Sequence, residues 1–240
     1  MADLLRRPVP VTGGLPPWEP APDDPRPDAV LLDMDGALLD TGTIWAGLVG
    51  SLVRAYGGVW RPDDDAAVLG WSIPALCAEI ARRGVPLPSD EVAEQLNAGV
   101  GAVLRRGLPW RPGGRTLLIA LRRAGMPFAL ITAMGTAVVD GIRGQLPEGA
   151  LVVAGDGPAR PRPAPDAYRL AAAQLRVDPQ RCTAVEESRA GVRAALEAGA
   201  LTFAVEPAVW LPTDLADHPR VRRVDGLVPV GRAVLATHAW

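Results

Sequence analysis

The sequence predicts an α/β protein with a doubly wound parallel sheet, into which a block of helices is inserted. Three observations predict this fold. Short apolar runs recur along the chain and end in Asp, Thr or Glu, helical stretches separate most of them, and nothing between residues 43 and 110 has the pattern of a strand. Strands that alternate with helices in this way build parallel sheets covered on both faces.

The composition is that of an ordinary globular protein. The 240 residues, 48% of them hydrophobic and 22% charged, suffice for one large domain or for a core with a smaller insertion. A net charge of −2 gives no electrostatic reason to expect a nucleic acid or an acidic membrane as partner. No apolar run is long enough to span a bilayer, and the start of the chain lacks a signal-type hydrophobic region. We therefore expect a cytoplasmic protein.

Several chemistries are excluded because the sequence contains no lysine: all 25 basic residues are Arg. A GKS/GKT phosphate loop, a pyridoxal Schiff base and a kinase-type lysine are impossible. The two histidines, His218 and His238, make a cluster of His metal ligands implausible. Cys77 and Cys182 are expected to be small core residues and not a disulfide.

Residues 1–28 are expected to form an extended or disordered tail. They include eight prolines and few large apolar residues. Such a segment buries too little apolar surface to offset the entropy lost on ordering.

The first strand is predicted at Ala29–Leu32, and two carboxylates follow it. Residues two apart on an extended chain share a face, so Asp33 and Asp35 are expected to point into one crevice. Two carboxylates so close repel unless a cation lies near them or one holds a proton. The first arrangement makes a magnesium site, and the second makes a nucleophile with a neighbouring acid and base. Gly36 allows a sharp turn after them.

The inserted block is predicted to be a helical cap domain at residues 43–110, leaving 29–42 and 111–240 for the α/β core. Apolar residues recur at helical spacing from residue 43 to Gly57, and Ser89 is expected to cap the last helix. Helices are predicted at 43–56, 63–69, 73–83 and 89–106. Its tryptophans could form an apolar wall for a substrate or the core of the bundle, and the core is the favoured interpretation; they are Trp45, Trp60, Trp71 and Trp110.

The later strands also end in polar residues. Thr132 follows a predicted strand and precedes a helix, where a hydroxyl and free helix N–H groups could bind phosphate oxygens. Glu186 and Glu187 follow another, and Ser188 is placed to cap the next helix. Strands are predicted at 128–131, 151–154, 183–185 and 201–205, and helices at 116–124, 135–143 and up to Gly199; the segment from 207 supports no prediction.

Four segments together resemble the haloacid dehalogenase superfamily, and in particular its β-phosphoglucomutase-like phosphatase branch. They are DMDGALLD at 33–40, Thr132 at its strand end, RPRPAPDAY at 160–168 and VEESRAGVRAALEAG at 185–199. The resemblance implies a Rossmann-like core, with the catalytic groups at the carboxyl edge of the sheet and a helical cap closing over the site.

The resemblance also implies roles for the carboxylates. Asp33 would attack phosphorus and form an aspartyl phosphate, while Asp35 would protonate the leaving oxygen and then activate water. Magnesium would be held by Asp33, the Asp35 carbonyl and Glu187, with Glu186 behind them or on a bound water. Glu187 departs from the family pattern, which has Asp there.

Thr132 and Arg162 would bind the phosphoryl oxygens. Arg162 stands where the family has Lys, and Pro161 where it has Gly. Arg keeps the positive charge but is a planar fork and not a point charge. We expect it to be a working cation.

These residues predict a magnesium-dependent phosphatase that acts on a small phosphorylated metabolite, as a monomer or homodimer. Two alternatives remain open. The same core would support a sugar-phosphate mutase, and the departures at Arg162 and Glu187 would also suit a catalytically impaired binding or regulatory protein.

Overall fold

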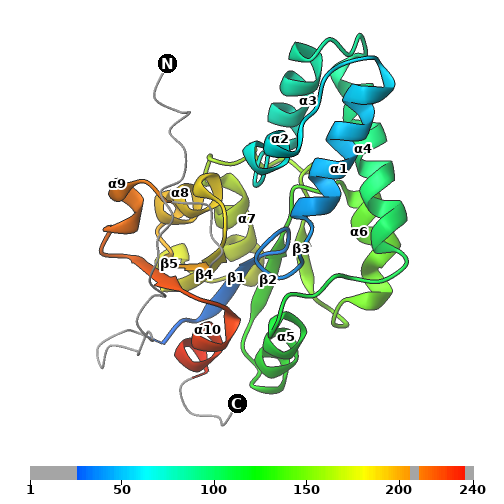
Figure 1. The fold of residues 1–240 in the computed structure, drawn as a ribbon. Coiled ribbons are helices and arrows are strands. Elements are labelled where there is room, and N and C mark those ends of the chain that lie inside the picture. Colours follow the sequence, from blue (N-terminus) through cyan, green and yellow to red (C-terminus); the bar gives the residue numbers. More distant parts are fainter. Residues whose placement is uncertain (1–25, 206–210, 236–240) are drawn as a thin grey trace.

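The computed structural model of this chain describes residues 26–205 and 211–235. It contains a six-stranded, wholly parallel sheet in the order β3-β2-β1-β4-β5-β6 (Figure 1). The strands are β1 (Ala29–Asp33), β2 (Phe128–Ile131), β3 (Leu151–Val153), β4 (Cys182–Glu186), β5 (Leu201–Val205) and β6 (Val221–Val224). From β1 the chain adds strands toward one edge of the sheet, and from β4 it adds them toward the other edge. The direction in which strands are added therefore reverses between β1 and β4.

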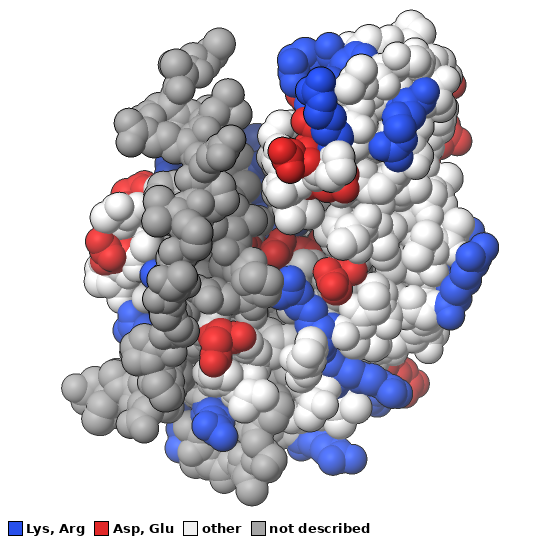
Figure 2. Space-filling model, viewed as in Figure 1, with Lys and Arg blue, Asp and Glu red and all other residues white. Residues whose placement is uncertain are grey.

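A helical bundle stands beside the sheet (Figure 1), and charged side chains of both signs lie over its outer end (Figure 2). It consists of α1 (Gly42–Ala55), α2 (Pro62–Ala67), α3 (Ile73–Arg82) and α4 (Ser89–Leu104). These helices enclose an apolar cluster of their own, which includes Val49, Ile80 and Leu96. The end of α4 also packs on α6 (Thr136–Ile142), because Leu104 and Val138 share the main core. The helices predicted for this block are present, and the exact limits of a cap domain stay a prediction.

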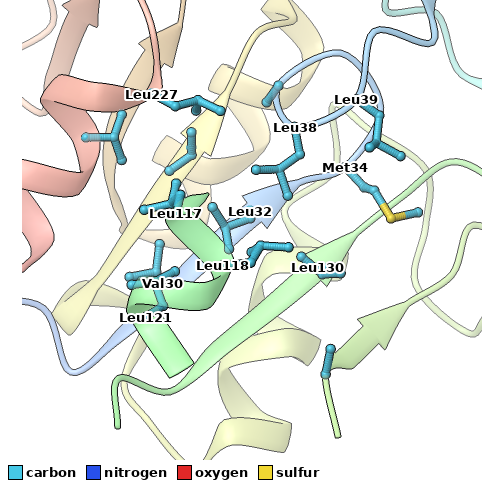
Figure 3. Packing of buried hydrophobic residues seen from close by; sticks show 14 of the residues in the cluster. Val30, Leu32, Met34, Leu38, Leu39, Leu117, Leu118, Leu121, Leu130 and Leu227 are labelled. Atoms are coloured by element: carbon cyan, nitrogen blue, oxygen red, sulfur yellow. The ribbon is translucent and has the colours of Figure 1, made fainter. Parts of the chain in front are cut away.

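Alternate side chains of β1 pack on opposite faces of the sheet. Val30 and Leu32 face a cluster built with α5 (Gly114–Arg123) and α10 (Leu227–Val234), as Figure 3 shows. Leu117, Leu118, Leu121 and Leu227 supply much of this layer. Both β1 side chains are fully buried, which is why the strand appears in the sequence as an unbroken apolar run.

The opposite face is covered by α7 (Asp166–Leu175) and α8 (Arg189–Ala198). Ala29 and Leu31 pack against a cluster that consists mostly of alanines, with Tyr168 as its largest member. Small side chains let these helices lie close to the sheet. Helices on both faces of a parallel sheet confirm the predicted doubly wound fold.

The sequence prediction missed α7, β6 and α10, as well as three short elements. The helix α7 begins directly after the proline-rich run at 161–165, β6 carries two arginines in four residues, and α10 contains Pro229 and Gly231. These features hide the apolar pattern on which prediction depends. The remaining short elements are α9 (Thr213–Ala216), η1 (Arg143–Gln145) and η2 (Pro179–Arg181).

Two helix caps were predicted from the sequence, and one of the two predictions is wrong. Ser89 is the first residue of α4 and not its cap, because the chain enters the helix through Pro88. Ser188 does cap α8, and its Oγ accepts a hydrogen bond from the Gly191 N–H at 3.0 Å.

Most of the predicted tail, residues 1–25, lies outside the described residues, as does His238. Its last residue, Asp28, is attached to the sheet: its N–H donates to the Arg181 carbonyl at 2.8 Å, and its carboxylate pairs with the Arg181 side chain. Within the described ranges, none of the helices has the length and hydrophobicity that crossing a bilayer requires.

Candidate active site

The parallel register brings the predicted site residues to one edge of the sheet. Asp33 is the last residue of β1 and lies level with Ile131, so Thr132 follows just beyond it. On the other side Leu32 pairs with Val185, which places Glu186 level with Asp33. This edge, where the strand order reverses, is where open α/β sheets bind ligands.

Arg162 joins two of the buried carboxylates. Its Nη1 donates to Asp33 Oδ1 at 2.7 Å and to Glu186 Oε1 at 2.8 Å. Burial and the carboxylate of Glu186 raise the pKa of Asp33 well above its ordinary value, and Arg162 opposes this shift. Burial works against the charge on Arg162, yet Asp33 and Glu186 raise its pKa, so the guanidinium stays charged. The position where the family has Lys therefore carries a cation bound to the expected carboxylates.

Glu186 is held by groups that the sequence analysis did not identify. The Tyr168 hydroxyl donates to Glu186 Oε1, and Oε2 accepts from the Glu187 N–H at 3.1 Å and from the N–H and hydroxyl of Ser188, both at 3.3 Å. The carboxylate also fills the space beside Gly191, where a Cβ would lie 2.0 Å from it. With both oxygens engaged, Glu186 serves to position Arg162. No sequence signal pointed to Tyr168 beyond its place in the third motif.

Asp35 is held by both parts of the molecule. Its Oδ2 accepts from the Thr132 hydroxyl and from the Ala133 N–H at 3.2 Å. Its Oδ1 accepts from the Thr41 hydroxyl at 3.3 Å and from Trp45 Nε1, in α1, at 3.4 Å. The structure therefore joins Thr132 to Asp35, and its predicted part in binding phosphate stays a prediction. The sequence analysis missed Thr41 and the polar role of Trp45.

Glu187 extends over the turn that follows Asp35. Its side chain lies so close to Gly36 that a Cβ there would be 2.2 Å from Oε1. Burial, with the nearby charge of Glu186, raises the pKa of Glu187 to about 7. Asp35, Gly36, Arg162 and Glu187 all line one cavity.

The donor set fits a hard divalent cation. Within residues 26–205 and 211–235, no three side chains of His, Cys, Asp or Glu converge to hold a metal by themselves. The predicted ligands, however, are two carboxylates and a backbone carbonyl. Asp33 Oδ2 is buried without a hydrogen-bond partner, and a carboxylate oxygen in that state calls for a cation or a hydrogen-bond donor. Oxygen donors with crowded negative charge suit Mg²⁺.

The tryptophans divide between the two interpretations. Trp60 belongs to the bundle core, as expected, where its Nε1 donates to Asp65 at 2.7 Å and Arg83 lies 5.0 Å from the ring centroid. Trp45 and Trp71 instead line the cavity beside Asp35. Trp45 also packs against both apolar clusters, so the core interpretation is incomplete for this residue; it is wrong for Trp71, which belongs to neither cluster.

Known proteins share both this sequence pattern and this fold. A family model described as haloacid dehalogenase-like hydrolase matches residues 27–199. Hexitol phosphatase A of Escherichia coli is 36% identical over 129 residues, which cover 52% of this chain and 56% of that protein. The protein CbbY of Cereibacter sphaeroides is 30% identical over 186 residues, covering 72% of this chain and 81% of the relative.

A solved structure of CbbY from Rhodobacter sphaeroides, in complex with xylulose-1,5-bisphosphate, superposes with a TM-score of 0.71. It is 26% identical, and the match covers 83% of this chain and 94% of that one. Relatives named as phosphatases support the assignment as a phosphoric monoester hydrolase. The chain thus belongs to the haloacid dehalogenase-like hydrolase family, in the phosphatase branch related to β-phosphoglucomutase.

Proposed function

We propose that this protein is a magnesium-dependent phosphatase that hydrolyses a small phosphorylated metabolite through an aspartyl-phosphate on Asp33. The observation that carries the proposal is the state of that carboxylate. One oxygen is fixed by Arg162 at 2.7 Å, and the other, Oδ2, is buried and accepts no hydrogen bond. A nucleophile needs such an oriented oxygen with an available lone pair.

Asp33 and Asp35 divide the chemistry. Asp33 Oδ2 attacks phosphorus, the bond from phosphorus to the ester oxygen breaks, and Asp35 gives its proton to the leaving alcohol. Asp35 then takes a proton from a water molecule that attacks the aspartyl phosphate, which releases phosphate and restores Asp33. Thr132, Thr41 and Trp45 hold the Asp35 carboxylate in place for both proton transfers.

Arg162 is the cation that would face the transferring group. Its position between Asp33 and Glu186 suits it to offset the charge of the phosphoryl oxygens as Asp33 approaches. Asp33, Glu187 and the Asp35 carbonyl are the groups that would hold Mg²⁺, which when bound would supply further positive charge at those oxygens. Thr132 would contact the same oxygens, as the sequence predicts.

The names of two relatives indicate the size of substrate to expect. One is named for hexitol phosphates, and CbbY is described with xylulose-1,5-bisphosphate. A small phosphorylated metabolite is therefore the class to test first in this chain.

The test is phosphate release from a panel of small phosphate esters, with magnesium or with EDTA. We expect turnover that requires magnesium and that falls to background in Asp33→Asn. Asp140→Asn, an exposed carboxylate on α6, is the matched control and should retain full activity. Turnover by Asp33→Asn equal to that of the wild type would contradict the nucleophile, and phosphate returned to a second position of a sugar in ³¹P NMR spectra would identify a mutase.

A further inference from the structure

We propose that the preferred substrate of this site is a monophosphate ester whose alcohol part is small, flat and apolar, and not a polyol phosphate or a bisphosphate. This inference rests on the proposed phosphatase function and narrows its substrate class. It follows from the surface that the helical bundle presents to Asp35.

The wall opposite the carboxylates is apolar. The segment between α2 and α3, with the first turns of α3, lines the cavity beside Asp35 with Val68, Leu69, Trp71, Ile73 and Leu76. Trp71 is 40% exposed and Leu69 37% exposed, so part of each side chain is available for contact with a ligand. Trp71 also lines a second cavity, which shares several lining residues with the first.

Apart from the Glu187 carboxylate, a proposed magnesium ligand, the polar side chains that line the first cavity already have partners within the protein. The Thr41 hydroxyl and Trp45 Nε1 both donate to Asp35, and Ser188 Oγ is bound to Glu186 and to the Gly191 N–H. Arg162 is the single basic side chain among the described residues that line it, and it is bound to Asp33 and Glu186. A second phosphate would find no further cation there.

Besides Arg162, one other basic side chain in the described part of the chain lines the second cavity, and it has a different partner. Arg160 lines it, and its guanidinium makes two hydrogen bonds to the Asp166 carboxylate, at 2.8 and 2.9 Å. Its charge is therefore offset by a neighbour from the same motif. A bisphosphate that used Arg160 would have to share its guanidinium with the Asp166 carboxylate, which would repel the second phosphate.

The spaces are also small. Gly70 lies so close to Ser188 that a Cβ at residue 70 would be 2.7 Å from the serine Cβ, so this segment rests directly on the core. The two cavities measure about 40 Å³ and about 60 Å³. A hydroxylated carbon chain placed here would lose its water partners against Leu and Trp side chains, whereas a flat ring would gain apolar burial and a stacking face.

The test compares benzyl phosphate with sorbitol 6-phosphate. Both are esters of primary alcohols, so their leaving groups differ in shape and polarity more than in reactivity. We expect kcat/KM to be higher for benzyl phosphate by about 100-fold, which corresponds to two sorbitol hydroxyls that lose their water partners without replacement, at a cost of about tenfold each. Trp71→Ala should narrow this ratio by about tenfold through the loss of apolar contact. Tyr56→Ala, an exposed aromatic residue of the same bundle outside both cavities, should leave the ratio unchanged.

Binding provides a readout that does not depend on turnover. Wild-type protein should bind benzylphosphonate at least tenfold more tightly than inorganic phosphate by calorimetry, and Trp71→Ala should remove that difference. Equal binding, or a kcat/KM that favours sorbitol 6-phosphate or fructose 1,6-bisphosphate, would overturn the inference. Tight binding of benzylphosphonate without turnover of any ester would support the apolar site and overturn the proposed hydrolysis instead.

Discussion

The carboxylate of Glu187 occupies the space beside the α-carbon of Gly36, where a Cβ would lie 2.2 Å from Oε1 and 2.6 Å from Cγ of the glutamate. Gly36 also has a φ of +98°, a conformation that other residues rarely adopt. The longer side chain at residue 187 is thus accommodated by a turn that has no side chain of its own. The glutamate at residue 187, where the resemblance predicts Asp, fits over this turn.

Gly36→Ala should therefore disable the site. The new methyl group would displace the Glu187 carboxylate and strain the turn after Asp35, so we expect magnesium-dependent activity to fall by about 10- to 100-fold, as when the support of a metal ligand is removed. Activity and Mn²⁺ affinity would both be measured. Gly47→Ala is the matched control: this glycine is exposed in α1, a Cβ added to it would have nothing within 4 Å, and the change should be neutral or stabilising. Full activity in Gly36→Ala would contradict a role for Glu187.

Tyr168→Phe should weaken the fold as well as the reaction. The hydroxyl is buried and donates to Glu186, and burial together with Glu186 raises the pKa of Tyr168, so it stays a donor at neutral pH. Its loss should lower the free energy of unfolding by about 1–3 kcal/mol and reduce kcat, because Arg162 loses part of its support. Urea denaturation measures the first effect. Tyr56→Phe, at an exposed position, should change neither quantity.

The fold could be predicted because the strands are buried on both faces. The run Ala29–Leu32 is entirely apolar for that reason, and its end at Asp33 marks the edge where ligands bind. The missed elements lack such a pattern. The four residues of β6 include Arg222 and Arg223, which are half-buried at the edge of the sheet, so no apolar run reveals the strand.

Only those residues of the site that belong to local sequence motifs could be predicted. The six predicted residues come together: five of them end a strand or closely follow one, and Arg162 lies in the loop between β3 and α7. The groups that support them come from elsewhere: Tyr168 reaches Glu186 from a helix on one face, and Trp45 reaches Asp35 from the bundle. Such contacts depend on how distant segments pack, and no spacing in the sequence encodes them.

Trp45→Phe tests the contact between the bundle and Asp35. The substitution keeps the aromatic ring and removes the N–H that donates to Asp35 Oδ1 at 3.4 Å. Since the bond is long, we expect a loss of about 1 kcal/mol in transition-state stabilisation, which is about fivefold in kcat. Trp110→Phe, a half-buried tryptophan that does not line the cavity beside Asp35, is the control and should retain its kcat. A change in KM alone in Trp45→Phe would show that the residue serves binding and not proton transfer.

The ionisation of Asp64 should determine how the stability of the bundle responds to acid. Its carboxylate accepts from the Arg61 N–H at 2.7 Å and from two nitrogens of Arg83, at 2.9 and 3.1 Å. The hydrogen bonds from Arg83 and Arg61 lower the pKa of Asp64 from 3.8 to about 2. A carboxyl group with a lowered pKa in the folded state stabilises the fold above its unfolded pKa, and that contribution is lost as the pH falls from about 4 toward 2.

Asp64→Asn should therefore lower the melting temperature at pH 7, and the difference from the wild type should shrink as the pH falls below 4. Because the pair is partly exposed, solvent limits the effect to about 1 kcal/mol or less at neutral pH. Thermal melts from pH 7 to pH 2.5 measure it, provided that the wild type still unfolds reversibly at the acid end. Asp63→Asn removes an exposed carboxylate from the same first turn of α2 and controls for the helix dipole. A difference between the Asp64 variant and the wild type that stayed constant down to pH 2.5 would mean that the interaction with Arg83 contributes nothing, and that the loss comes from the amide substitution itself.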